Sequence, residues 1–430
     1  MTRTIDSAVT RENIANMEAL AKNRLVHGLS NVSIGFDSDA ARNPLGNNTK
    51  SSPLISAEAA LKIRNTRSKR YGLLDTARKI LWNEGVKAGQ KYPANHHRTI
   101  KCMHVRTGSN VGINVSTNYG KAFYTGLAVC GNVWTCPVCS AKIQERRRLE
   151  VASAFDYAYE NGKKVLMVTF TFPHYSWQKL KSLLDNQSAA FARLRKGKLW
   201  DQFREKMGMI GIIRSLEVTI GDNGWHPHTH EAWIVNKDVD AEKLRDYVTN
   251  RWFKMCQKEG LVPEGKETDF LTHSVHVMDN CSTSDYLAKQ DDSRNWGVDR
   301  ELVKGSSKAS DQKKGIHPFA LLELAGKGDK NSSEKYVEYC IAMKSKRQLF
   351  WSRGLKDLVG VADKDDVKLA NEKDDQALVV STLTETDWKC IIAHKAKSYI
   401  LNLAEIEGID GIRRWLISPE IPINEESKKE

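Results

Sequence analysis

The chain has 430 residues, 40% of them hydrophobic, which is enough for two or three domains with a sizeable core. Its 66 basic and 53 acidic side chains give a net charge of +13, which favours a polyanionic partner, nucleic acid ahead of a membrane surface. The opening residues MTRTIDSAVTREN contain no apolar stretch of the secretory-signal type, and no run approaches 18 apolar residues. We therefore expect a cytoplasmic protein that does not span a membrane.

In chain order, the first 95 residues are polar in parts and predict helices within Thr10–Leu25 and Ser56–Lys87. Residues His97–Ala141 alternate in a β-like way between turns. Lys142–Glu160 predicts a helix, charged early and apolar later, and VLMVTFTF, residues 165–172, predicts a buried strand.

A β-hairpin follows a basic, helical-looking stretch at Tyr175–Met209. The runs IGIIRSLEVTI and WHPHTHEAWIV, joined by GDNG, are two β-rich segments on either side of a turn. Residues 238–258 predict a helix, 270–278 a short strand, and ADKDDVKLANEKDD near the end a solvated loop. This order predicts an α+β fold with a central antiparallel sheet flanked by helices.

Three histidines stand at every second position of the second hairpin strand, namely His226, His228 and His230. Side chains alternate along a strand, so the three imidazoles point to one face, where two can converge on one divalent ion. Glu217 on the partner strand can complete the site with an oxygen ligand. Imidazole plus carboxylate suits Mn²⁺ or Mg²⁺. His226 is the weaker candidate ligand because it precedes Pro227 near the strand's beginning.

Four cysteines predict a second metal site. Cys136 and Cys139 form C-P-V-C, a zinc-knuckle spacing, with Cys130 six residues earlier and Cys102 further upstream. Four thiolates would make a closed structural zinc site, with His104 as an alternative to Cys102. The remaining cysteines are scattered and are expected to be ordinary core residues: Cys256, Cys281, Cys340 and Cys390.

Basic stretches interleaved with aromatics predict contacts to single-stranded DNA. One stretch borders the cysteines, with Arg146, Arg147 and Arg148; another is KSKRQLFWSRGLK at 344–356. Solvated helix faces remain an alternative, and RLRKGK at 193–198 fits either interpretation equally. The residues predicted to bind DNA are Arg146, Arg147, Lys346, Arg347, Trp351 and Arg353.

Three motifs in order, VTFTFPH, GWHPHTH and SDYLAKQ, resemble those of the HUH endonucleases. The most similar family is that of plasmid rolling-circle replication initiator (Rep) proteins. Two further stretches of this chain, CGNVWTCPVCSAKIQERRR and KSKRQLFWSRGLK, also resemble sequences of that family. The resemblance spans Cys102 to Leu358. It implies an antiparallel sheet of about five strands with the histidine strand in the middle.

The resemblance also implies an activity, metal-dependent nicking of single-stranded origin DNA. Tyr286 would attack a phosphodiester, forming a 5′-phosphotyrosyl link and freeing a 3′-OH primer, with Lys289 as the lysine of the tyrosine motif. Metal ligands would be His228, His230 and Glu217, holding Mg²⁺ or Mn²⁺. Expected partners are single-stranded and origin DNA, with host helicase and polymerase as further candidates.

Some relatives carry their tyrosine just after the lysine, where this chain has Gln290. The terminating cleavage is therefore open between a second nucleophile and an activated water. The candidate residues are Asp285, Asp291 and Glu301 for the water, with Tyr336 and Tyr339 as distant alternatives.

We expect four segments: an N-terminal extension (1–95), a zinc-binding module (96–150), an HUH nuclease domain (151–315) and a C-terminal region with its tail (316–430). Three alternative functions stay open. They are an HUH transposase or relaxase, a zinc-stabilised DNA-binding regulator without catalysis, and a metal oxygenase using the same histidines and acid. The oxygenase would need neither Tyr286, the cysteines nor the positive charge.

Overall fold

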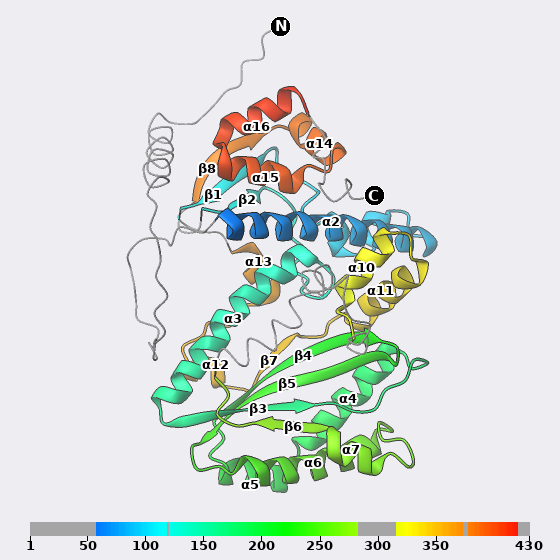
Figure 1. Ribbon diagram of the computed structural model, residues 1–430, viewed down its shortest axis with the longest axis vertical. Coiled ribbons are helices and arrows are strands. Elements are labelled where there is room, and N and C mark those ends of the chain that lie inside the picture. The colour runs from blue at the N-terminus through cyan, green and yellow to red at the C-terminus, as the bar shows by residue number, and fades with distance from the viewer. Residues whose placement is uncertain (1–56, 118–119, 283–314, 373–376, 420–430) are drawn as a thin grey trace, which may run out of the picture. The chain divides into compact units, whose positions relative to one another are not determined.

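The computed structural model describes residues 57–117, 120–282, 315–372 and 377–419 (Figure 1). The chain forms two units. The larger holds residues 63–109 and 126–372, and the smaller holds residues 57–62, 110–117, 120–125 and 377–419.

A five-stranded antiparallel sheet lies at the centre of the larger unit (Figure 1). Its order is β6 (Val275–Met278), β3 (Lys163–Phe170), β5 (Gly224–Asn236), β4 (Gly211–Gly221) and β7 (Leu349–Trp351). The predicted hairpin is β4–β5, closed by a two-residue Asp222–Asn223 turn. The predicted central place of the histidine strand is confirmed, because β5 pairs with both β3 and β4.

Helices cover both faces of this sheet, as predicted (Figure 1). The helix α3 (Pro137–Glu160) packs Phe155 and its apolar neighbours against Ala232 and Ile234 of β5. On the other face, α4 (Leu180–Leu194) and α6 (Ala241–Lys258) pack against Trp233. Alternation along β5 sorts its side chains, so the three histidines share the α3 face with Ala232 and Ile234.

The larger unit contains further, mostly short, helices. They are α2 (Ala57–Lys87, in this unit from Ile63 on), η1 (Pro93–Asn95), η2 (Arg98–Lys101), α5 (Lys198–Lys206), α7 (Glu267–His273), α10 (Pro318–Gly326), α11 (Lys330–Ala342), α12 (Leu355–Leu358) and α13 (Asp366–Asn371). The helix predicted within Ser56–Lys87 is confirmed as α2; the one within Thr10–Leu25 lies outside the described residues.

Three local predictions were wrong in part. The strand predicted at 270–278 begins only at Val275, because the preceding residues form the helix α7. This helix buries Phe270 edge-on against Phe253 of α6. The charged run near the end is no mere loop: Asp365 caps α13, which buries Leu369. The stretch from His97 that was predicted to be β-like begins instead with the short helix η2. The His97 ring accepts a hydrogen bond from the Thr99 N–H and so caps this helix.

The smaller unit has a three-stranded antiparallel sheet in the order β2 (Ala122–Thr125), β1 (Val111–Ser116), β8 (Ala377–Leu383). Tyr124 packs edge-on against Trp388, with ring centroids 5.3 Å apart, and donates its hydroxyl proton to the Lys397 carbonyl. Its helices are α14 (Glu385–Ala393), α15 (Lys397–Ile406) and α16 (Gly408–Ile417). Throughout the described ranges, no helix is both long and apolar enough to cross a membrane.

Candidate metal centres

Glu217, His228 and His230 converge on the α3 face of the sheet. Glu217 of β4 lies directly opposite His228 in the register of the hairpin, and His230 is one step further along β5. The Glu217 Oε2 atom is 3.0 Å from His228 Nε2 and 3.1 Å from His230 Nε2. The three side chains keep 10–15% of their surface exposed, so the group opens toward solvent.

These distances fit a divalent cation. Neighbouring ligands of an octahedral ion, each bonded at about 2.1 Å, lie about 3.0 Å apart. Each imidazole Nε2 that faces the Glu217 carboxylate can either donate an N–H to it or, without that proton, hold a metal ion together with it. Burial acts to raise the pKa of Glu217, but the hydrogen bonds to His228 and His230 outweigh it and hold that pKa well below its usual range.

The far side of each histidine ring in this group has its own hydrogen-bond partner. His230 Nδ1 is 2.9 Å from Thr169 Oγ1 on β3, and His228 Nδ1 is 3.3 Å from the carbonyl oxygen of His226. An Nδ1–H that donates to these oxygens leaves Nε2 as the atom directed at Glu217. Thr169 therefore orients His230, since the two residues also pair across β3 and β5.

The structure does not bring His226 into this group. Its Nε2 lies 2.7 Å from Thr171 Oγ1, and its ring packs between His228 and His174, at centroid distances of 4.7 and 4.5 Å. Burial and the neighbouring His228 lower the pKa of His226 to about 3, so the ring is neutral near pH 7. His226 thus contacts the candidate ligand His228 through its backbone and its ring.

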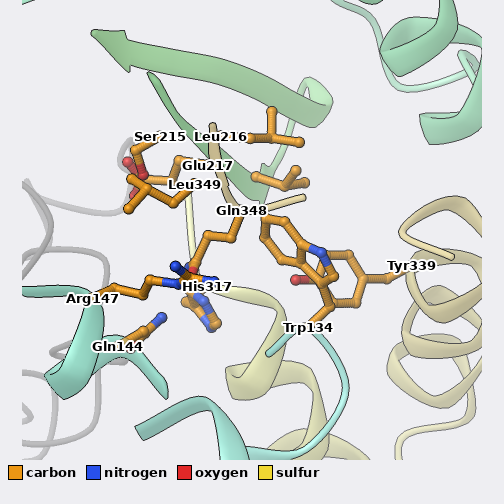
Figure 2. Close-up of a pocket in the computed structure, with 11 residues that line it drawn as sticks. Trp134, Gln144, Arg147, Ser215, Leu216, Glu217, His317, Tyr339, Gln348 and Leu349 are labelled. Atoms are coloured by element: carbon orange, nitrogen blue, oxygen red, sulfur yellow. The ribbon is translucent and has the colours of Figure 1, made fainter. Parts of the chain in front are cut away.

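A pocket lies beside Glu217 and is lined by residues that alternate to both sides of β4 (Figure 2). Figure 2 shows Gln348 reaching from the sheet, and Arg147 from α3, toward His317. His317 accepts the N–H of Phe319 at the beginning of α10, and burial lowers its pKa to about 4. The lining residues are Trp134, Gln144, Arg147, Ser215, Leu216, Glu217, Val218, His317, Tyr339, Gln348 and Leu349.

The four predicted cysteines form the second cluster, which is fully buried. Sγ of Cys102 lies 3.5 Å from that of Cys139 and 3.6 Å from that of Cys136, and Cys130 Sγ lies 3.6 Å from Cys139 Sγ. Ligands of a tetrahedral zinc ion bonded at about 2.3 Å lie about 3.8 Å apart, so the four sulfurs fit zinc. Hydrogen bonds from Cys102 and the other two thiols hold the pKa of Cys139 well below its usual range.

Local backbone geometry builds this cysteine cluster. Cys136 is the N-cap of α3, and its sulfur accepts the N–H of Cys139, while Cys102 sulfur accepts the N–H of Cys130. Gly131 has a positive φ of 56°, and a Cβ there would come 2.7 Å from the backbone of Val367 in α13. His104, the predicted alternative, stands outside the group. Of the other cysteines, Cys256, Cys281 and Cys340 are buried and Cys390 is half-buried.

Two predicted DNA-binding arginines pair with acids in this structure. Arg146 Nε is 3.1 Å from Glu372, and Arg147 binds Glu150 and Asp366 at 2.8 and 3.1 Å. These bonds join α3 to α13 beside the cysteine cluster. The role of both arginines in DNA binding stays a prediction.

The residues of the second predicted DNA-binding stretch differ in exposure and in their partners. Arg347 and Arg353 are exposed, whereas Lys346 pairs with Asp185 at 3.0 Å. Trp351 is half-buried against the α3-face core, with Lys356 5.7 Å above its ring. Exposure thus leaves the two arginines as the more accessible members of this stretch.

Tyr286 and Lys289, the predicted catalytic pair, lie outside the described residues, as do Asp285, Asp291 and Glu301. The two distant tyrosines are placed: Tyr336 and Tyr339 are buried in the core, and burial raises the pKa of each well above its usual value. Tyr336 donates its hydroxyl proton to the Thr135 carbonyl at 2.6 Å. Packing is therefore the role that the structure gives these two phenols.

Sequence reasoning missed three residues of the metal-centre surroundings: Thr169, Thr171 and His317. The threonines alternate in VTFTF just as the histidines do in HPHTH, and that shared period was a readable signal. Nothing local in the sequence marks His317, because it approaches Glu217 through the tertiary fold.

The family model Rep_1, described as Replication protein, matches residues 126–400, more than half of the chain. The chain belongs to this replication protein family. "Protein rep" of Streptomyces lividans is 24% identical over 347 residues, which cover 65% of this chain and 75% of that protein. The resemblance to plasmid Rep initiators is thereby confirmed.

Two shorter matches cover part of the chain. A protein of Streptomyces cyanogenus named "Neomycin resistance protein" is 31% identical over 152 residues, 30% of this chain and 35% of that protein. "Protein rep" of Lentilactobacillus hilgardii is 24% identical over 126 residues, 29% of this chain and 38% of that protein. No solved structure matches the chain.

Proposed function

We propose that this replication protein nicks single-stranded origin DNA, with Tyr286 as the nucleophile, and so starts rolling-circle plasmid replication. The observation that carries the proposal is the open Glu217–His228–His230 group on the central strand of the sheet, in a chain of the replication protein family. Three donors with an accessible side suit a cation that must also bind a substrate oxygen.

The bond changes balance without any further reactant. The Tyr286 oxygen attacks phosphorus, a phosphotyrosyl ester forms on the 5′ side, and the P–O3′ bond breaks. The phenol proton is lost and the released 3′-oxygen gains one, giving the 3′-OH primer. Mg²⁺ or Mn²⁺, held by Glu217, His228 and His230, would neutralise and polarise the phosphate. The ester stores the bond energy needed to rejoin the strand, and Lys289 would favour the phenolate or hold a phosphate oxygen.

The residues that flank the tyrosine segment lie near this face. Cys281 is buried in the α3-face core, and its N–H donates to the carbonyl of Val165 in β3. On the other side, Ile316 pairs with Ile220 of β4, and His317 reaches the pocket beside Glu217. The chain on both sides of 283–314 is therefore tied to strands of the sheet that carries the Glu217–His228–His230 group, and His317 lines the pocket beside Glu217, which supports a role for Tyr286 there.

We also propose that the cysteine cluster holds a structural zinc ion. Four buried sulfurs leave no open ligand position, so this zinc would stabilise the fold and take no part in the chemistry. It would fix the beginning of α3, the helix that covers the histidine face of the sheet and carries Arg146 and Arg147.

The test uses labelled single-stranded oligonucleotides that tile both strands of the DNA flanking the gene. With Mn²⁺ or Mg²⁺, we expect a detergent-resistant protein–DNA adduct on one oligonucleotide and a released fragment that a polymerase can extend. Tyr286→Phe should abolish the adduct. Tyr247→Phe, at a partly exposed tyrosine of α6, is the matched control and should leave it unchanged.

The possible outcomes separate the alternatives. An undiminished adduct in Tyr286→Phe would show that another residue is the nucleophile. If no oligonucleotide gives an adduct although the protein binds DNA, the nicking proposal is wrong and a DNA-binding regulator is favoured.

A further inference from the structure

Two aromatic rings form an exposed stack just after β3. Tyr175 and Trp177 lie nearly parallel, with centroids 4.6 Å apart and an interplanar angle of 12°. Trp177 is 74% exposed, against 44% for Trp82 of α2. An indole left in water in this way is unusual for a packing residue, since burial would stabilise the fold.

The loop that carries this aromatic stack is fastened to the β4–β5 turn. Tyr175 N–H donates to Gln178 Oε1 at 2.8 Å, and His174 Nδ1 lies 3.1 Å from the carbonyl oxygen of Asn223. Gly224, with φ of 83°, allows the close approach, because a Cβ there would come 2.8 Å from the Ser176 backbone. The rings are therefore presented by a packed loop.

A row of histidine rings leads from the Glu217–His228–His230 group to His174, the residue just before the aromatic stack. Centroid distances are 5.1 Å from His230 to His228, 4.7 Å from His228 to His226 and 4.5 Å from His226 to His174. Tyr175 follows His174 directly in the chain. A strand whose phosphate reaches Glu217, His228 and His230 would thus have the stack within reach of its neighbouring nucleotides.

Positive charge accompanies the aromatic stack. Lys179 is exposed two residues beyond Trp177, and Lys266 is close enough for its charge to act on Tyr175, although it also pairs with Asp269. Cations for phosphates beside an aromatic face for bases are the combination that binds single-stranded nucleic acid without sequence preference.

We propose that the Tyr175–Trp177 stack is a platform on which an unpaired base of the DNA strand entering the metal site stacks. The inference rests on the proposed nicking function and adds to it a surface that selects single-stranded over duplex DNA. A duplex hides its bases inside the helix, so only an unpaired base can lie on Trp177.

The test measures fluorescence anisotropy of a labelled oligothymidylate and of a duplex, with full-length protein. We expect Trp177→Ala to weaken single-strand binding about tenfold, within the range for loss of one base–aromatic stack, and to leave duplex binding unchanged. Trp177→Phe should restore most of the affinity. Trp82→Ala, at a 44% exposed tryptophan of α2, is the matched control and should behave as wild type.

Mn²⁺ affinity and adduct formation are measured on the same proteins. Unchanged Mn²⁺ affinity in Trp177→Ala, with weaker single-strand binding, supports the platform. If Trp177→Ala binds the oligothymidylate as tightly as wild type while wild type forms the adduct, the platform is wrong and the nicking function stands. If wild type forms no adduct but the Trp177→Ala difference persists, the nicking function is wrong and the platform stands as a single-strand binding surface.

Discussion

The two donor clusters of this replication protein differ in number of ligands and in access. The cysteine cluster has four sulfurs, all buried. The Glu217–His228–His230 group has three donors that stay partly exposed beside a pocket. A closed cluster can only hold the chain together, whereas an open one can also bind a substrate oxygen.

The helix α3 connects the two clusters. Its first turn supplies Cys136 and Cys139, and two turns of its second half pack Val151 and Phe155 on the histidine face of the sheet. The fold thus places the closed cysteine cluster at one end of the helix and the open group under its second half. If this division is right, damage to each cluster should give a different loss, stability in one case and metal-dependent activity in the other.

The largest effect is expected for Cys136→Ser. Loss of one of four buried thiolates should release the zinc and lower the free energy of unfolding by several kcal/mol, since structural zinc sites contribute folding energy directly. Zinc content and a thermal melt measure this. Cys390→Ser, at a half-buried cysteine outside the cluster, should keep the zinc and the melting temperature; equal losses in both variants would contradict the account.

Glu217→Ala should spare the fold but remove the open site. We expect Mn²⁺ affinity, measured by calorimetry, to fall by about 100-fold or more, because the one anionic ligand of the group is gone. The melting temperature without Mn²⁺ should change little. Glu334→Ala, at an exposed glutamate, is the control. Wild-type Mn²⁺ affinity in Glu217→Ala would place the site elsewhere.

Thr169→Val should weaken the open site through its ligand. Losing the partner of His230 Nδ1 should reduce Mn²⁺ affinity about 10- to 100-fold. Thr169→Ser keeps the hydroxyl and should restore binding, which separates positioning from packing. Thr171→Val, whose partner His226 stands outside the group, should have a much smaller effect; the reverse ranking would make His226 a ligand.

Brief dialysis against EDTA should produce the smallest change in the fold. We expect EDTA to strip the open site and leave the buried zinc in place, because the cysteines exclude the chelator while the protein stays folded. The circular dichroism spectrum should then match that of untreated protein, and metal analysis should still find zinc. Unfolding upon this treatment would mean that the open site also holds the fold together.

Much of this comparison was predictable because its signals are local. The alternation of HPHTH sets one face, and the hairpin register that follows from the GDNG turn puts Glu217 opposite His228. The C-P-V-C spacing predicted that Cys136 and Cys139 lie together in a cysteine cluster. The central position of β5 followed from the resemblance to the HUH endonucleases.

The remainder depends on tertiary packing. The sequence pattern around Phe270 predicts a strand, yet the contact of this ring with Phe253 favours the short helix α7. The acidic stretch around Asp366 reads as solvated, yet α13 docks against Gly131 and neutralises Arg146 and Arg147. The partners that Arg146 and Arg147 find there are more than 200 residues away in the chain, and such contacts leave no local sequence pattern.

Adduct formation at constant zinc content tests the division of labour most directly. Protein stripped by EDTA, with its zinc measured, is titrated with Mn²⁺ in the presence of the single-stranded oligonucleotide that wild type cleaves. We predict no adduct at zero Mn²⁺ and a saturable rise as Mn²⁺ is added, while zinc stays unchanged. An adduct that forms in the stripped protein, with zinc as the sole metal, would contradict the assignment of the chemistry to Glu217, His228 and His230.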